Sequence, residues 1–128
     1  MAQTDLDSYR WENRLILLFY PSEQDLDYVE FDQQLEEEQA ELEDRDLVVF
    51  RVFEKGKSWV GKEALSIEDI KVLRDRYRIS QTEKVLILIG KDGGEKLRQK
   101  GSEIALEPIF PLIDGMPMRR MEMRKKGG

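Results

Sequence analysis

The sequence predicts an α/β domain with a mixed central sheet and helices on both faces. An apolar run at residues 14–20, a helical pattern and a β-branched, aromatic-rich run at residues 47–53 together indicate a βαβ unit. A second helical pattern then precedes an apolar run at residues 84–89, which ends in an Asp-Gly turn typical of a β-hairpin. A last helical pattern follows the hairpin. With 128 residues, the chain suits a single domain spanning residues 1–128, whose ends at 1–8 and 119–128 could be flexible.

The first helix is expected to begin near Asp25, after the strand has ended at Pro21 and a capping Ser22. Its predicted buried stripe has spacings of three, four and seven residues and consists of Tyr28, Phe31, Leu35 and Leu42. Residues 55–65 contain two glycines and no clear period, so we expect a loop there.

The second helix has a capping signal in Ser66, with Asp69 three residues later. Its predicted buried side consists of Ile67, Ile70, Leu73 and Tyr77. After the hairpin, Pro108 and Pro111 fit only the first turn of a helix, which we expect at about 107–114 with Ile109, Phe110 and Ile113 facing inward and Gly115 at its end. The residues after Pro117 are expected to form a short helix or a frayed tail.

Charge is unevenly distributed along this chain of net charge −6. Residues 22–46 hold twelve acidic residues and one arginine, which predicts an acidic face, whereas residues 119–126 are basic. The basic segment also follows or contains Met116, Met118, Met121 and Met123. It could bind an acidic partner, an anionic membrane or the acidic helix of another copy, or it could simply be solvated, while the pI near 4.9 disfavours nucleic acid.

Several classes of chemistry are excluded by composition. The chain contains no cysteine and no histidine, so it has no thiol nucleophile, no Ser-His-Asp triad and no histidine-ligated zinc. Lys55-Gly56-Lys57-Ser58 resembles the end of a phosphate-binding loop, but Arg51 stands where that loop needs a glycine. The carboxylates at 25–32 resemble a calcium loop, but Glu30 stands where its glycine belongs. No apolar run reaches the roughly 20 residues of a membrane-spanning helix.

Five segments carry a resemblance to a known family. They are YRWENR (9–14), FYPS (19–22), RDLVVF (45–50), LIGKDGG (88–94) and LIDGMPMRR (112–120). With the order of predicted elements, they resemble a bacterial thioredoxin-like family of unknown function, which is also similar to repeats in vertebrate secreted matrix proteins of the coiled-coil-domain-containing and sushi-repeat-containing types. The resemblance implies a thioredoxin-like fold, a periplasmic or extracellular setting, and contacts with a protein or matrix partner. It carries over no catalytic residue.

The chain departs from redox-active thioredoxins at two places. Gln24 and Asp27 lie roughly where such enzymes have cysteines, and residues 82–85 lack the proline that precedes their third strand. The sequence therefore predicts a non-catalytic binding or scaffold domain, without cofactor or metal. The alternative is an enzyme of a non-thiol class that uses carboxylate, Lys or Tyr groups near Pro21-Ser22. Candidate interaction residues are Trp59, Arg119, Arg120 and Arg124. The sequence does not identify the partner or the oligomeric state. No signal peptide follows Met1, so a cytoplasmic setting stays open as an alternative.

Overall fold

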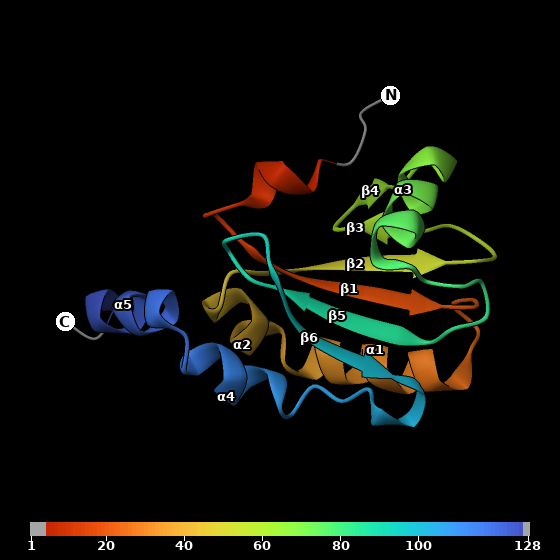
Figure 1. Ribbon diagram of the computed structural model, residues 1–128. Helices are drawn as coiled ribbons and strands as arrows, with labels where there is room; N and C mark the ends of the chain where they lie inside the picture. Colours follow the sequence, from red (N-terminus) through yellow and green to blue (C-terminus); the bar gives the residue numbers. More distant parts are fainter. Residues whose placement is uncertain (1–4, 127–128) are drawn as a thin grey trace.

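The centre of the molecule is the apolar strand β1, Arg14–Tyr20, in which every residue is buried. The computed structural model describes residues 5–126, and β1 lies in a six-stranded sheet of order β4-β3-β2-β1-β5-β6 (Figure 1). The other strands are β2 (Leu47–Phe53), β3 (Trp59–Val60), β4 (Glu63–Ala64), β5 (Val85–Ile89) and β6 (Glu95–Lys100). β1 and β2 are parallel, and the remaining neighbours are antiparallel. The mixed sheet predicted from the sequence is thus confirmed.

Helices cover both faces of the sheet. Because side chains alternate between the two faces along β1, each face has its own apolar core beneath its helices. Ile16, Leu18 and Tyr20 pack in one core beneath α1 (Leu26–Glu37), α2 (Gln39–Asp44) and α4 (Ile109–Asp114). Leu15, Leu17 and Phe19 pack in the other core, beneath α3 (Ile67–Tyr77) and the 3-10 helix Leu6–Tyr9. A second 3-10 turn, Gly101–Glu103, follows β6, and α5 (Pro117–Lys126) extends beyond the sheet next to α4 (Figure 1).

Most predicted elements are present. The β5–β6 hairpin turns at Asp92-Gly93, and the Ser66–Asp69 capping box at the start of α3 forms both of its hydrogen bonds. The residues predicted to line the first helix are all buried, but the helix is interrupted at Glu38, so that Leu42 belongs to α2. The α1 cap is Asp25 rather than the predicted Ser22, because the Asp25 carboxylate accepts hydrogen bonds from the backbone N–H groups of residues 27 and 28.

Two expectations about residues 55–70 are wrong. The segment predicted as a loop contains the short strands β3 and β4, and Ser58 holds them against β2: its hydroxyl accepts from the Phe53 N–H at 2.8 Å. Ile67 is 86% exposed rather than buried, because it faces a groove instead of the sheet.

Both ends of the described chain are helical. The segments expected to be flexible, 1–8 and 119–128, include most of the 3-10 helix Leu6–Tyr9 and most of α5, whereas residues 1–4 and 127–128 lie outside the described part of the chain. Within residues 5–126, no helix combines the length and the apolar character needed to cross a membrane.

Candidate functional site

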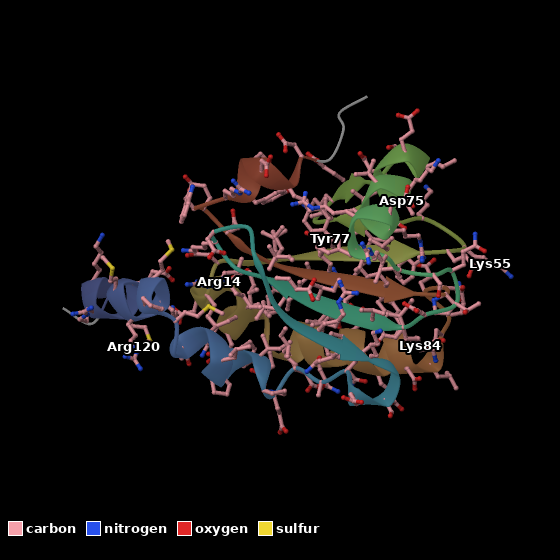
Figure 2. The ribbon with its side chains drawn as sticks, viewed as in Figure 1. Arg14, Lys55, Asp75, Tyr77, Lys84 and Arg120 are labelled. Atoms are coloured by element: carbon pink, nitrogen blue, oxygen red, sulfur yellow. The ribbon has the colours of Figure 1, made fainter. Side chains whose placement is uncertain are left out.

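A groove of about 1040 Å³ opens at the edge of the sheet where the parallel strands β1 and β2 end. It lies between the end of β2, α3 and the loop at residues 79–82. Figure 2 shows this edge by the labels Lys55 and Lys84, opposite the edge that carries Arg14 and Arg120. The carboxyl ends of parallel strands are where open α/β sheets bind ligands, so this groove is the candidate site.

Most of the surface of the groove is apolar, but charged side chains also line it, and one of the cations among them is partly buried; the charged residues are Glu54, Lys71, Arg74 and Asp75. Phe53, Ile67, Ile70 and Ile79 supply the apolar surface. Arg74, from the last turns of α3, lies among them, with its guanidinium carbon 5.9 Å from the centroid of the Phe19 ring. The groove can therefore contact both an apolar body and a negative charge.

Arg74 is incompletely paired. Its Nη1 donates a hydrogen bond to the Ser80 carbonyl oxygen at 3.1 Å, but its Nη2 is buried without a hydrogen-bond partner. Within residues 5–126, no carboxylate lies within the 4 Å of an ion pair with Arg74. Burial lowers the pKa of the Arg74 guanidinium, and the charge of Glu54 acts in the opposite direction. Burying a charge without a partner costs free energy, which an anionic ligand at this position would recover.

The turn at Pro21-Ser22 lies next to the groove, because the N–H of Lys55, which stands between two lining residues, donates to the Pro21 carbonyl oxygen at 3.0 Å. Around this turn lie the lysine, tyrosine and carboxylates of the enzyme hypothesis. Lys84 Nζ lies 2.8 Å from the Asp27 carboxylate and 3.1 Å from that of Asp25. Hydrogen bonds from Asp27 and Asp25 raise the pKa of Lys84, and burial raises the pKa of Tyr20. Because these shifts move both groups further from neutrality, neither becomes a better proton acceptor near pH 7.

A second tyrosine behaves in the same way. Burial raises the pKa of Tyr28 to about 12, despite the opposing effect of Arg51. Ser22 accepts the Asp25 N–H through its backbone carbonyl, in the turn that leads into α1. The side chains around the turn therefore form a structural junction. Glu54, Lys71 and Asp75 also line the groove without an ion pair among residues 5–126, but they are exposed, whereas Arg74 is partly buried and has a nitrogen without a hydrogen-bond partner.

The four predicted interaction residues do not form one surface. Trp59 lies in β3 rather than in a loop and is half-buried, with its ring 5.5 Å from that of Phe53. Arg120 and Arg124 are exposed on α5, whereas Arg119 on the same helix is only 2% exposed. The α5 residues lie at the opposite end of the molecule from the groove (Figures 1 and 2).

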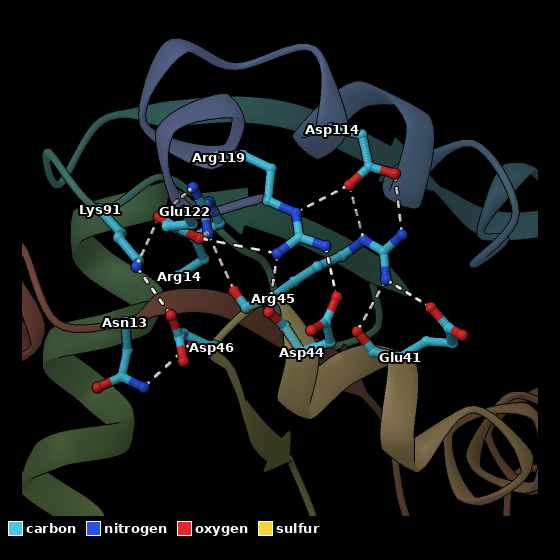
Figure 3. A network of polar contacts seen from close by, with 10 residues as sticks. All are labelled: Asn13, Arg14, Glu41, Asp44, Arg45, Asp46, Lys91, Asp114, Arg119 and Glu122. Carbon is cyan, nitrogen blue, oxygen red and sulfur yellow. Dashed lines mark hydrogen bonds and ion pairs between the residues drawn. The ribbon is translucent and has the colours of Figure 1, made fainter. Parts of the chain in front are cut away.

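Arg119 belongs to a network of charges that joins α5 to the body of the domain (Figure 3). It pairs with Asp44 at the end of α2 and, at 3.0 Å, with Asp114 at the end of α4. Arg45 binds the same Asp114 carboxylate at 2.9 Å and reaches Glu41 at 2.8 Å. Burial acts to raise the pKa of Asp114, but the hydrogen bonds from Arg45 and Arg119 hold that pKa below its usual value.

The network continues to the first strand. Glu122 on α5 accepts hydrogen bonds from both terminal nitrogens of Arg14, each at 3.1 Å, and from Lys91 at 2.8 Å. Lys91 also pairs with Asp46 at 2.9 Å. Burial acts to raise the pKa of Glu122, but the bonds from Arg14 and Lys91 hold it below its usual value. These paired charges stabilise the docking of α5.

Arg74 was missed in the sequence, although a signal for it exists. It follows Ile70 by four positions and therefore lies on the same side of α3 as the partly buried stripe. A cation placed beside an apolar stripe either extends its head to solvent or requires a partner. Which of these applies depends on residues 79–82, whose position next to α3 is a tertiary feature.

Comparison with solved structures confirms the thioredoxin-like fold. The chain is similar to a reduced 2-Cys peroxiredoxin of Plasmodium vivax, with a TM-score of 0.67 and 15% identity over 92% of this chain and 85% of that one. It is also similar to the mitochondrial 2-Cys peroxiredoxin of Plasmodium falciparum, with a TM-score of 0.61 and 15% identity over 98% of this chain and 85% of that one. At this identity the likeness concerns the fold alone, and the chain lacks cysteine.

Sequence comparison finds a relative and a family. The chain is 26% identical to coiled-coil domain-containing protein 80 of Danio rerio over 92% of this chain, but it spans only 15% of the length of that protein. A family described as a domain of unknown function (DUF4174) matches residues 5–122, which include β1, the groove and the whole of the charged network. The chain therefore belongs to this family of domains of unknown function.

Proposed function

We propose that this domain is a non-catalytic binding module that holds an anionic group, carried on an apolar body, in the groove beside Arg74. One observation carries the proposal: Arg74 is partly buried, with one nitrogen lacking a hydrogen-bond partner and no carboxylate within ion-pair distance in the described chain. Guanidinium groups bind carboxylates and phosphates through paired hydrogen bonds, and the free Nη2 supplies one such donor.

The shape of the groove supports an amphipathic ligand. Ile67 is almost fully exposed within it, and the partly buried Ile70 and the buried Ile79 line it together with Arg74. A ligand that covers these side chains would gain the free energy of burying apolar surface, in addition to its contact with the guanidinium. A volume of about 1040 Å³ is large enough for a peptide end or a small amphipathic molecule.

Binding is favoured over catalysis by the groups that are present. The chain has no thiol and no imidazole, and the lysine and tyrosines near Pro21-Ser22 have pKa values shifted away from neutrality. These side chains therefore support recognition better than proton transfer. We further propose a periplasmic or extracellular setting and a protein or matrix partner, for which the support is the family resemblance of the sequence.

Titration of the full chain with octanoate and octanamide, followed by calorimetry or NMR, tests the anion site. The two ligands share an apolar tail and differ in charge. We expect octanoate to bind about tenfold more tightly, because a charged hydrogen bond is worth about 1.5–3 kcal/mol. Arg74→Gln should abolish that preference.

Arg76→Gln is the matched control, because Arg76 is an exposed arginine on the same helix. The octanoate preference should survive this change. Equal affinity of the wild-type protein for the two ligands, or a preference that persists in Arg74→Gln, would contradict the proposed site.

A further inference from the structure

A second pocket lies at the opposite end of the sheet and has a different character. It encloses about 300 Å³ between the β5–β6 turn, the residues before β1 and the start of α5. Trp11, Met116, Pro117 and Met118 form its apolar walls, while Arg14 and Lys96 are among its polar residues. A space of this size fits one large side chain of a partner rather than an extended ligand.

Trp11 gives the pocket a rigid aromatic wall. The side chain is 61% exposed, and the backbone has a φ of 69°, a left-handed conformation that is rare for a bulky residue. A hydrogen bond of 2.7 Å from the Trp11 N–H to the Lys91 carbonyl oxygen supports this conformation. Strained backbone occurs preferentially at functional sites, and an exposed tryptophan beside methionines is a typical anchor in protein interfaces.

Arg14 provides a second and independent indication. It lines the pocket and is only 1% exposed. Its terminal nitrogens donate to Glu122 and to the Arg45 carbonyl oxygen, but its Nε is buried without a hydrogen-bond partner among the described residues. An oxygen atom that entered the pocket could accept this hydrogen bond and remove the cost of a buried unpaired donor.

The charge around the pocket identifies the kind of partner. Lys96 lies at the pocket, where it is paired with Asp92 at 2.8 Å. The helix that begins at Pro117 exposes Arg120, Arg124 and Lys125. The pocket lining itself holds three cations, Arg14, Lys91 and Lys96, and one carboxylate, Asp92. This excess of positive charge attracts negatively charged segments and repels basic ones.

We propose that this pocket docks a short acidic segment of a partner protein, with a large apolar side chain held between Trp11 and the methionines and an oxygen accepting a hydrogen bond from Arg14 Nε. The site is independent of the Arg74 groove, from which it is separated by the length of the sheet. Either proposal can therefore fail without the other.

NMR of the full chain labelled at its methionine methyl groups can test the proposal. The probe is an acetylated and amidated pentapeptide with a central leucine between two pairs of acidic residues. We expect saturable shifts of the Met116 and Met118 methyl signals, whereas Met123, which is farther along α5, should respond less. The same peptide with a central alanine should bind at least about tenfold more weakly, because the apolar anchor is lost.

Two variants distinguish peptide binding in the pocket from nonspecific binding to exposed apolar side chains. Trp11→Ala should weaken binding of the leucine peptide by about tenfold or more, the factor that corresponds to about 1.4 kcal/mol. Leu26→Ala is the matched control, because Leu26 at the start of α1 is an apolar side chain even more exposed than Trp11, 79% against 61%, and this change should leave binding unaltered.

Four results would overturn the proposal. One is the absence of saturable methionine shifts with the acidic leucine peptide, and another is affinity that Trp11→Ala does not change. The third is equal binding of a pentapeptide in which lysines replace the acidic residues. Methionine shifts that depend on protein concentration without peptide would assign the pocket to a second copy and would likewise contradict an acidic segment from another protein.

Discussion

The amino and carboxyl ends of β1 differ in how they accommodate buried positive charge. At the amino end, Arg14, Arg45 and Arg119 are each paired with carboxylates from other elements. At the carboxyl end, Arg74 lies in a groove with one hydrogen bond and no ion pair within the described chain. Where the protein itself supplies the counter-charges, the arginines serve the fold; where it does not, we infer that a ligand supplies them. The following experiments test that distinction.

The largest effect is expected from Arg119→Ala. This change removes the Arg119 ion pairs with Asp44 and Asp114, although Asp114 keeps its pair with Arg45. We expect the free energy of unfolding to fall by about 2–3 kcal/mol, less than for a fully buried pair because both carboxylates are partly exposed. Urea denaturation measures the change. Arg120→Ala, at the neighbouring exposed position, should alter stability by less than about 0.5 kcal/mol. Similar losses of unfolding free energy in the two variants would contradict a structural role for the network.

The network should also make stability depend on pH. The pKa of Glu122 is lower in the folded protein than its ordinary value, so its contribution is present above the unfolded pKa of about 4.3 and is lost as the pH falls through the folded value. Glu122→Gln should therefore flatten the decline in stability between about pH 5 and pH 2. Denaturation curves at several pH values test this, and an unchanged pH dependence in the variant would count against the network.

Loss of the α1 cap, which lies near the carboxyl end of β1, should lower stability by an intermediate amount. Asp25→Ala removes the side chain that accepts two N–H groups at the start of α1, and we expect a loss of about 1 kcal/mol. Ser22→Ala should cost less than about 0.5 kcal/mol, because the Ser22 side chain does not cap the helix. Thermal or urea unfolding of both variants measures the difference. A larger loss of stability in Ser22→Ala than in Asp25→Ala would indicate that Ser22 is the cap.

The smallest effect on folding is expected at Arg74. Arg74→Met removes one hydrogen bond to Ser80 but also removes a partly buried unpaired charge, so the free energy of unfolding should change by less than about 1 kcal/mol. This contrasts with Arg119 in the same denaturation assay. A loss as large as that of Arg119→Ala would show that Arg74 serves the fold and would weaken its assignment as a ligand anchor.

The sequence predicted the elements whose signals are local. The limits of β1 and β2 follow from apolar runs, and the start of α3 follows from Ser66 and Asp69, three positions apart. The strand pair β3–β4 was missed because each strand has only two residues and depends on Ser58 for its contact with β2. The interruption of the first helix at Glu38 has no glycine or proline to mark it.

The candidate sites were less predictable, because they depend on contacts between distant residues. Nothing near Arg14 indicates that its counter-charge is Glu122, 108 positions away. The exposed tryptophan is Trp11 and not Trp59, which the sequence favoured because its segment lacked a recognisable strand pattern. The importance of Arg74 likewise depends on the position of the loop at 79–82.

The pairing of Arg14 with Glu122 has a consequence for biosynthesis. During translation the first strand is made long before the last helix. Arg14 therefore has no Glu122 carboxylate to pair with until almost the whole domain has emerged from the ribosome. A fragment that ends before residue 122 would retain this arginine without that partner, and we expect it to fold poorly. The family match itself extends to residue 122. When this domain is excised from a longer protein, the cut should therefore be placed beyond that glutamate.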